Sequence, residues 1–128
     1  MRVFKIKWFA RYARDERISD ESLWEAVERA QRGLVDADLG GHVIKQRVAR
    51  KGQGRSSGYR VLIGYEAGRR GVFIFCFSKN TRENITTREL ESFKRLAASW
   101  LTMDDRGIEH AIKHGELVEV KDDKTKET

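Results

Sequence analysis

The sequence has no apolar run long enough to cross a membrane, and it has one cysteine among 128 residues. A transmembrane helix needs about 20 consecutive apolar residues, so we expect no membrane span and no membrane partner. A lone cysteine cannot form an internal disulfide, and Cys76 lies in the apolar run GVFIFCFS, which favours a buried thiol over a catalytic one. The charged opening run MRVFKIKW does not resemble a signal peptide, so we expect a cytoplasmic protein.

Acidic residues are scarce in the middle third of the chain. Residues 42–82 contain one acid, Glu66, and ten bases, so this segment carries a net charge of +9, compared with +6 for the whole chain. The bases are Lys45, Arg47, Arg50, Lys51, Arg55, Arg60, Arg69, Arg70, Lys79 and Arg82. Most charged residues belong to solvated surfaces, but like charges repel one another in a folded sheet. This concentration of bases therefore predicts a surface that binds a polyanion.

The order of the predicted elements favours one α+β domain. A chain of this length suits a single domain, which we expect over residues 1–120, followed by a disordered tail over residues 121–128. Strands are expected at 2–8, 42–50, 58–66, 71–78 and 116–120, and helices from residue 8, over 20–33, from residue 86 and over 104–115. Antiparallel strands need only short connections, so this order predicts helices packed on a small, mostly antiparallel sheet.

Few patterns in the chain suggest a bound metal, a nucleotide or a protein nucleophile. His110 and His114 are one helical turn apart, but no acidic or cysteine ligand is visibly paired with them, which favours a surface pair over a zinc site. The segment GQGRSSG lacks the Gly-Lys-Ser/Thr ending of a phosphate-binding loop, and no hydrolase triad is legible. We therefore expect no metal and no cofactor. The aromatic residues at core spacings are assigned to packing, and they are Trp8, Phe9, Trp24, Phe93 and Trp100.

The basic residues of the predicted sheet can converge on one point. Lys45 and Arg47 leave the same face of one strand, Arg60 lies on the next strand, and Lys79 and Arg82 follow the strand after that. Adjacent strands are about 4.8 Å apart, so these groups can reach one phosphate. Clustered cations stabilise the extra charge of a pentacoordinate phosphate. RNA supplies its own nucleophile, the 2′-hydroxyl, so its cleavage needs a proton acceptor and a proton donor but no metal.

Several motifs resemble one known family. RSSGYRVLIGY, followed by VFIFCFSKNTREN and ELESFKRLA, resembles the RelE/ParE superfamily of toxins from bacterial type II toxin–antitoxin systems. GLVDADLGGHVIKQRVARKGQG and FSKNTRENI are more similar to its HigB-like RelE branch, and the resemblance covers residues 3 to about 120. It implies a small antiparallel sheet with helices and ribosome-dependent cleavage of mRNA in the A site. It also implies a cognate antitoxin, whose complex with the toxin represses their operon.

The resemblance implies roles for individual residues. Lys45 and Arg47 match the RelE strand that carries paired lysines, and Arg60 matches the arginine of the SSGYR motif. Lys79 and Arg82 fit a Lys-Arg-Glu-Arg run of RelE, here KNTR. We therefore expect two sets of residues, catalytic Lys45, Arg47, Arg60 and Arg82, and RNA-binding Arg50, Lys51, Arg55 and Lys79.

The sequence departs from the RelE pattern in the residues that transfer protons. Asn80 stands where RelE has a catalytic arginine, and Thr86 falls near the position of its tyrosine. The C-terminal histidine and acid of HigB proteins have no clear match. Arg82 or Glu83 could substitute for these groups.

Two other functions stay open at this point. A ParE-like inhibitor of DNA gyrase would have the same fold without RNA chemistry, and the departures from RelE are consistent with it. A non-catalytic module would bind RNA in a salt-sensitive manner without cutting it. The convergence of Lys45, Arg47 and Arg60 favours RNA cleavage, although Arg60 could instead form a structural ion pair with Glu66 or Glu83.

Overall fold

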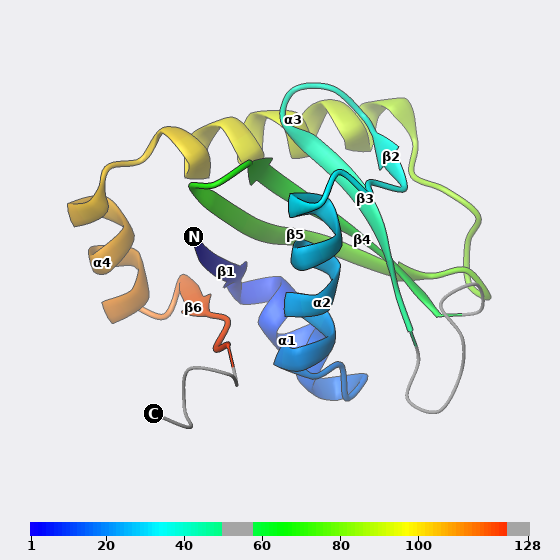
Figure 1. The fold of residues 1–128 in the computed structure, drawn as a ribbon, viewed down its shortest axis with the longest axis horizontal. Helices are drawn as coiled ribbons and strands as arrows, with labels where there is room; N and C mark the ends of the chain where they lie inside the picture. The colour runs from blue at the N-terminus through cyan, green and yellow to red at the C-terminus, as the bar shows by residue number, and fades with distance from the viewer. Residues whose placement is uncertain (50–57, 123–128) are drawn as a thin grey trace.

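The computed structural model describes residues 1–49 and 58–122, arranged as helices on both sides of one sheet (Figure 1). The elements are β1 (Arg2–Ile6), α1 (Lys7–Asp15), α2 (Asp20–Gln31), β2 (Ala37–Asp38), β3 (Val43–Val48), β4 (Tyr59–Glu66), β5 (Arg70–Ser78), α3 (Thr87–Thr102), α4 (Asp105–Lys113) and β6 (Leu117–Glu119). The predicted RNA-binding residues Arg50, Lys51 and Arg55 lie outside the described residues, as does the predicted tail beyond Asp122.

The sheet has the strand order β2-β3-β4-β5-β1-β6. Its neighbouring strands are antiparallel except for β1 and β5, which run parallel. The predicted α+β class and mostly antiparallel sheet are therefore confirmed. The sheet also contains the two-residue strand β2, which pairs with β3 and is too short for an alternation pattern to reveal.

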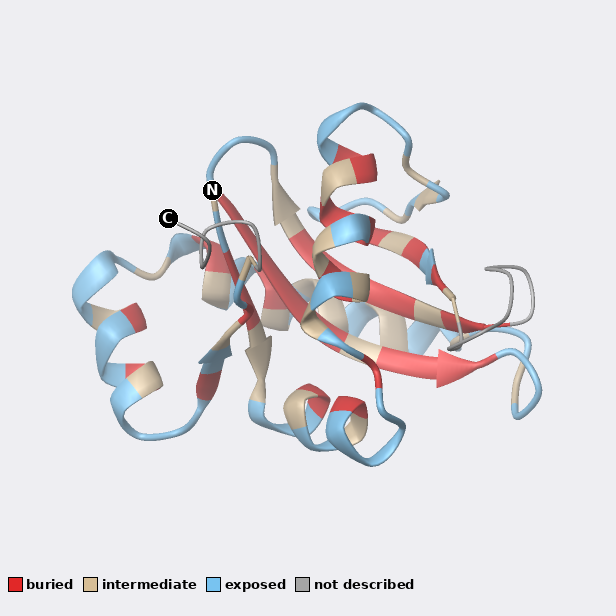
Figure 2. Ribbon diagram, turned by 60° about the horizontal axis from the view of Figure 1, so that its bottom comes forward, coloured by how far each residue is buried: buried red, intermediate tan, exposed pale blue. Residues whose placement is uncertain are grey.

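Two hydrophobic layers cover the sheet. Helices α1 and α2 bury one face, and α3 and α4 bury the other, with β5 buried along nearly its whole length as its apolar sequence predicted (Figure 2). Cys76 is 2% exposed, and burial raises the pKa of its thiol, which confirms the prediction of a buried cysteine. One packing prediction was wrong, because Trp8 is 44% exposed. It follows the end of β1 and lies at the border of the core.

A β-bulge interrupts the pairing of β4 with β5. Ile63 pairs with Phe73, but Leu62 pairs with Phe75, so Ile74 is an extra residue in β5. Beyond the bulge, Phe77 lies directly opposite Arg60 on β4.

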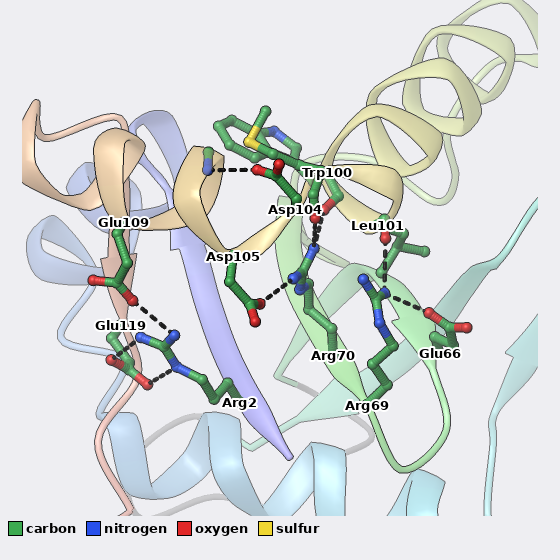
Figure 3. Close-up of polar contacts among 12 residues, drawn as sticks. Arg2, Glu66, Arg69, Arg70, Trp100, Leu101, Asp104, Asp105, Glu109 and Glu119 are labelled. Carbon is green, nitrogen blue, oxygen red and sulfur yellow. Dashed lines mark hydrogen bonds and ion pairs between the residues drawn. The ribbon is translucent and has the colours of Figure 1, made fainter.

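Two arginines at the turn between β4 and β5 bind the C-terminal end of helix α3 (Figure 3). Arg70 donates to the carbonyl oxygens of Trp100 (2.8 Å) and Met103 (2.7 Å), and Arg69 donates to that of Leu101 (2.7 Å). The last carbonyls of a helix have no partner within the helix, and its C-terminus carries partial negative charge. Helix α3 has no basic residue in its own last turn, so Arg69 and Arg70 supply the positive charge that complements its C-terminus. Arg69 and Arg70 are thus accounted for structurally, although both belong to the basic segment.

No helix in the described part of the chain is long and apolar enough to span a membrane.

Candidate functional site

Three of the four predicted catalytic residues lie together on β3 and β4. Arg47 and Arg60 are direct partners in the antiparallel register, and Lys45 lies two residues before Arg47, on the same face. Side chains directly opposite each other have Cβ atoms about 4.5–5.5 Å apart. Arg47 is exposed, and the other two are partly buried. We call Lys45, Arg47 and Arg60 the cation face. Like charges placed directly opposite each other are unfavourable in a sheet.

The backbone of Arg47 is held through both its N–H and its carbonyl group. β2 pairs with β3 at Ile44 and Lys45, so Arg47 lies past the end of this pairing. There, side chains take over the role of a neighbouring strand. The N–H of Arg47 donates to Asp36 Oδ2 (2.7 Å), and its carbonyl oxygen accepts a hydrogen bond from the guanidinium of Arg29. Arg29 is itself buried and pairs with Glu25, so the edge carrying Arg47 is rigidly anchored on α2.

Gln46 connects the same strand to the core on the opposite face. Its side chain is fully buried, as its place between Ile44 and Val48 predicted. The amide oxygen accepts from the N–H of Asp36 (2.7 Å), and the amide nitrogen donates to the carbonyls of Ala26 (2.9 Å) and Leu34 (3.1 Å). The sequence showed a polar residue among apolar ones, but it did not show which backbone groups that residue satisfies.

The fourth predicted catalytic residue, Arg82, is committed to an ion pair. It lies in the loop after β5, and its guanidinium donates to both carboxylate oxygens of Glu89 (3.1 and 2.5 Å) and to the carbonyl of Asn84 (3.0 Å). Its guanidinium carbon is 5.8 Å from the ring centroid of Phe77, the cross-strand partner of Arg60. The structure therefore places Arg82 next to the cation face, but with much of its hydrogen-bonding capacity used at the start of α3.

Lys79 and Thr86 occupy the two ends of the same loop. Lys79 is exposed in the turn that follows β5. Thr86 is the N-cap of α3, and with Glu89 it forms a capping box. At the position where the resemblance expects a tyrosine, this chain therefore has a residue that fixes the start of the helix.

The Arg82–Glu89 contact should make the thermal stability of the protein depend on pH in the acidic range. The hydrogen bonds from Arg82, and then those from Thr86, lower the pKa of the Glu89 carboxyl from 4.5 to about 2. Because the pKa is depressed by folding, this stabilisation is complete above pH 4.5 and disappears as the pH falls towards 2. We expect Glu89→Gln to lower the melting temperature near neutral pH, with a difference from wild type that shrinks across this window. Thermal unfolding followed by circular dichroism measures it, with Glu91→Gln on the same helix as control, and a pH-independent difference would contradict the assignment.

The described charged groups that border Arg47 are of both signs. An open hollow of about 620 Å³ borders Arg47, but its lining mixes Arg29 and Arg32 with Glu25 and Asp36. Elsewhere, His110 and His114 are exposed with ring centroids 4.1 Å apart. Among the described residues, no group of three or more histidine, cysteine or acidic side chains is placed to hold a metal ion.

Comparison with known proteins agrees with this geometry. The family model described as the RelE toxin of the RelE/RelB toxin–antitoxin system matches residues 1–120. No curated protein matches the chain. The match confirms the superfamily that the SSGYR and FSKN motifs indicated, whereas the HigB-like branch stays a prediction from the motifs. With a match over nearly the whole chain, the protein belongs to the RelE toxin family.

Proposed function

We propose that this toxin is a ribosome-dependent mRNA endonuclease that inhibits translation without a catalytic metal. The observation that carries the proposal is the cation face, in which Arg47 and Arg60 are held opposite each other on adjacent strands with Lys45 beside them. An ordered sheet fixes such groups before the substrate arrives, as electrostatic stabilisation of a transition state requires. Membership of the RelE toxin family supports the same conclusion.

The proposed reaction uses the substrate's own nucleophile. The 2′-oxygen of the RNA attacks the adjacent phosphorus, giving a 2′,3′-cyclic phosphate and releasing the 5′-oxygen of the next nucleotide. Lys45, Arg47 and Arg60 would stabilise the negative charge that accumulates on the phosphoryl oxygens. One group must accept the proton of the 2′-hydroxyl, and another must protonate the leaving oxygen. Glu83 is our candidate acceptor, because it is exposed and follows Arg82 in the loop beside Phe77.

The cation face is open, which favours a substrate that is held in position by another particle rather than by the toxin itself. Arg47 is exposed at the edge of the sheet, past the end of the β2 pairing. An open surface orients a flexible RNA strand poorly, and orientation contributes strongly to catalysis. We propose that the ribosomal A site holds the mRNA in position, which also places the toxin in the cytoplasm.

The expected regulator is a cognate antitoxin with an acidic segment. RelE toxins pair with antitoxins, and a segment of net charge +9 would attract such a partner electrostatically. We propose that the antitoxin covers the cation face or displaces the C-terminal helix.

Expression in a bacterium tests the proposed function directly. We expect translation to stop, messages to be cut at codons on the ribosome, and growth to recover when the neighbouring small reading frame is co-expressed. Mapping of mRNA 5′ ends, measured with and without that frame, provides the readout. Inhibition of DNA gyrase with intact mRNA would support the ParE-like alternative instead. Salt-sensitive RNA binding without any cleavage would leave only the non-catalytic module.

A further inference from the structure

An aromatic ledge beside the cation face is formed by one residue of helix α1 and one residue of β5, the strand that adjoins β4. We define the ledge as Trp8 and Phe75, whose rings stack with centroids 5.0 Å apart and an interplanar angle of 21°. Phe77 connects the ledge to the cation face, because it lies opposite Arg60 and its ring centroid is 6.2 Å from that of Phe75. Phe77 is only 3% exposed, so the exposed aromatic surface at the end of this row of rings is that of Trp8.

Other rings pack against the ledge, and Trp8 remains partly exposed. Phe93 of α3 stacks on Phe75 with centroids 4.8 Å apart, and Tyr12 of α1 stacks on Trp8 with centroids 5.2 Å apart. These contacts hold the rings in place, yet Trp8 stays 44% exposed. A large aromatic side chain that is fixed but unburied is a common feature of surfaces that bind a partner.

Cations flank the exposed end of the ledge. On α1, Lys7 and Arg11 are exposed and four residues apart, so they form one stripe of the helix. Trp8 and Tyr12 form the adjacent stripe with the same spacing. The ledge thus lies between Lys7 and Arg11 on one side and the cation face on the other. Aromatic rings that stack bases, interleaved with cations that follow the phosphates, are the usual composition of a single-stranded RNA surface.

We propose that Trp8 stacks an unpaired base of the same RNA strand whose phosphate lies at the cation face, while Lys7 and Arg11 contact the phosphates beside that base. The inference rests on the proposed function for the presence of that strand. It assigns α1 a role in holding RNA. The positive charge on both sides of Trp8 favours a nucleotide over an uncharged protein segment, and the stacking surface gives an unpaired base a contact that an acidic peptide would not need.

Binding of a non-cleavable oligonucleotide tests the proposal without requiring catalysis. The probe is a short single-stranded RNA with 2′-O-methyl groups, compared with the same backbone lacking its bases, and fluorescence anisotropy gives the dissociation constants. Base stacking contributes about 1–3 kcal/mol per base, so Trp8→Ala should weaken binding of the complete RNA roughly 5- to 100-fold. Binding of the abasic RNA should not change, and Trp8→Phe should retain most of the affinity. Val118→Ala, which shortens another exposed apolar residue, on β6 and outside the ledge, is the matched control.

Substitutions of Lys7 and Arg11 should affect RNA binding differently from substitution of Trp8. Lys7→Ala and Arg11→Ala should weaken binding of both probes and reduce the slope of affinity against salt, because fewer counterions are released. Trp8→Ala should leave that slope unchanged.

Four outcomes would overturn the proposal. The first is wild-type protein binding the two probes equally well, and the second is Trp8→Ala binding the complete RNA like wild type. The third is Trp8→Ala losing both probes together with a lower melting temperature, which would make the residue structural. The fourth is unchanged RNA binding with weaker neutralisation by the antitoxin, which would make the ledge a protein-docking surface. Base-dependent binding without any mRNA cleavage on ribosomes would instead refute the proposed function and leave the ledge supported.

Discussion

Replacing Arg60 by alanine is expected to reduce mRNA cleavage roughly 10²- to 10³-fold, the usual cost of removing one group that stabilises transition-state charge. Binding of the toxin to ribosomes should change only a few-fold, because most of its basic residues remain. Arg60 lies opposite Arg47 on paired strands, so the substitution removes one charge from an arrangement that the sheet keeps in place. Cleavage of a reporter mRNA on ribosomes, ribosome co-sedimentation and thermal unfolding should be measured on the same preparation.

Two further variants make this experiment decisive. Arg60→Lys keeps the charge but not the planar guanidinium, so it should recover part of the activity. Arg106→Ala removes an exposed charge from α4, far from the cation face (Figure 1), and should cut like wild type. A folded Arg60→Ala variant that cuts at the wild-type rate would show that the active site lies elsewhere. Loss of cleavage and binding together with a lower melting temperature would make Arg60 structural.

Replacing the buried Gln46 by leucine is expected to cause a large decrease in the free energy of unfolding. The side chain is fully buried and satisfies three backbone groups, those of Ala26, Leu34 and Asp36. An unpaired buried polar group costs about 1–3 kcal/mol, and leucine would leave these groups unpaired while fitting a similar volume. We therefore expect the free energy of unfolding to fall by about 3 kcal/mol or more.

Urea unfolding at constant pH measures the effect of Gln46→Leu. Gln31→Leu makes the same chemical change at an exposed position of α2, and it should alter the free energy of unfolding by less than about 0.5 kcal/mol. Because Asp36 also holds the N–H of Arg47, the Gln46 variant should lose cleavage activity below its melting temperature as well. Equal stability of the two variants would show that the buried amide is dispensable.

Sequence patterns predicted the sheet face correctly because alternation along a strand is a local property. Lys45 and Arg47 were expected on one face and Gln46 on the other, and the burial of β3 agrees. The pairing of Arg47 with Arg60 depends on the register of two strands, which the motif order suggested but could not fix. The α+β class followed from the spacing of the strands alone.

What the sequence could not reveal are contacts between residues far apart in the chain. The basic segment was counted as one surface, yet Arg70 lies 5% exposed beneath the end of α3. Likewise, Arg82 is held by Glu89 across a loop whose path no local pattern describes. Trp8 has the helical spacing of a core residue, but its exposure depends on β1 ending at Ile6 while β5 continues past it.

The bulge at Ile74 reverses which face of the sheet the odd-numbered residues of β5 occupy. Before it, odd-numbered residues such as Phe73 belong to the core beneath α1 and α2. After it, odd-numbered residues such as Phe75 and Phe77 pair with Leu62 and Arg60, on the other side of the sheet. An uninterrupted ladder would instead place Cys76 opposite Arg60 and direct both phenylalanines towards the layer beneath α1 and α2. One inserted residue thus lets a single strand complete the interior with its first half and border the cation face with its second.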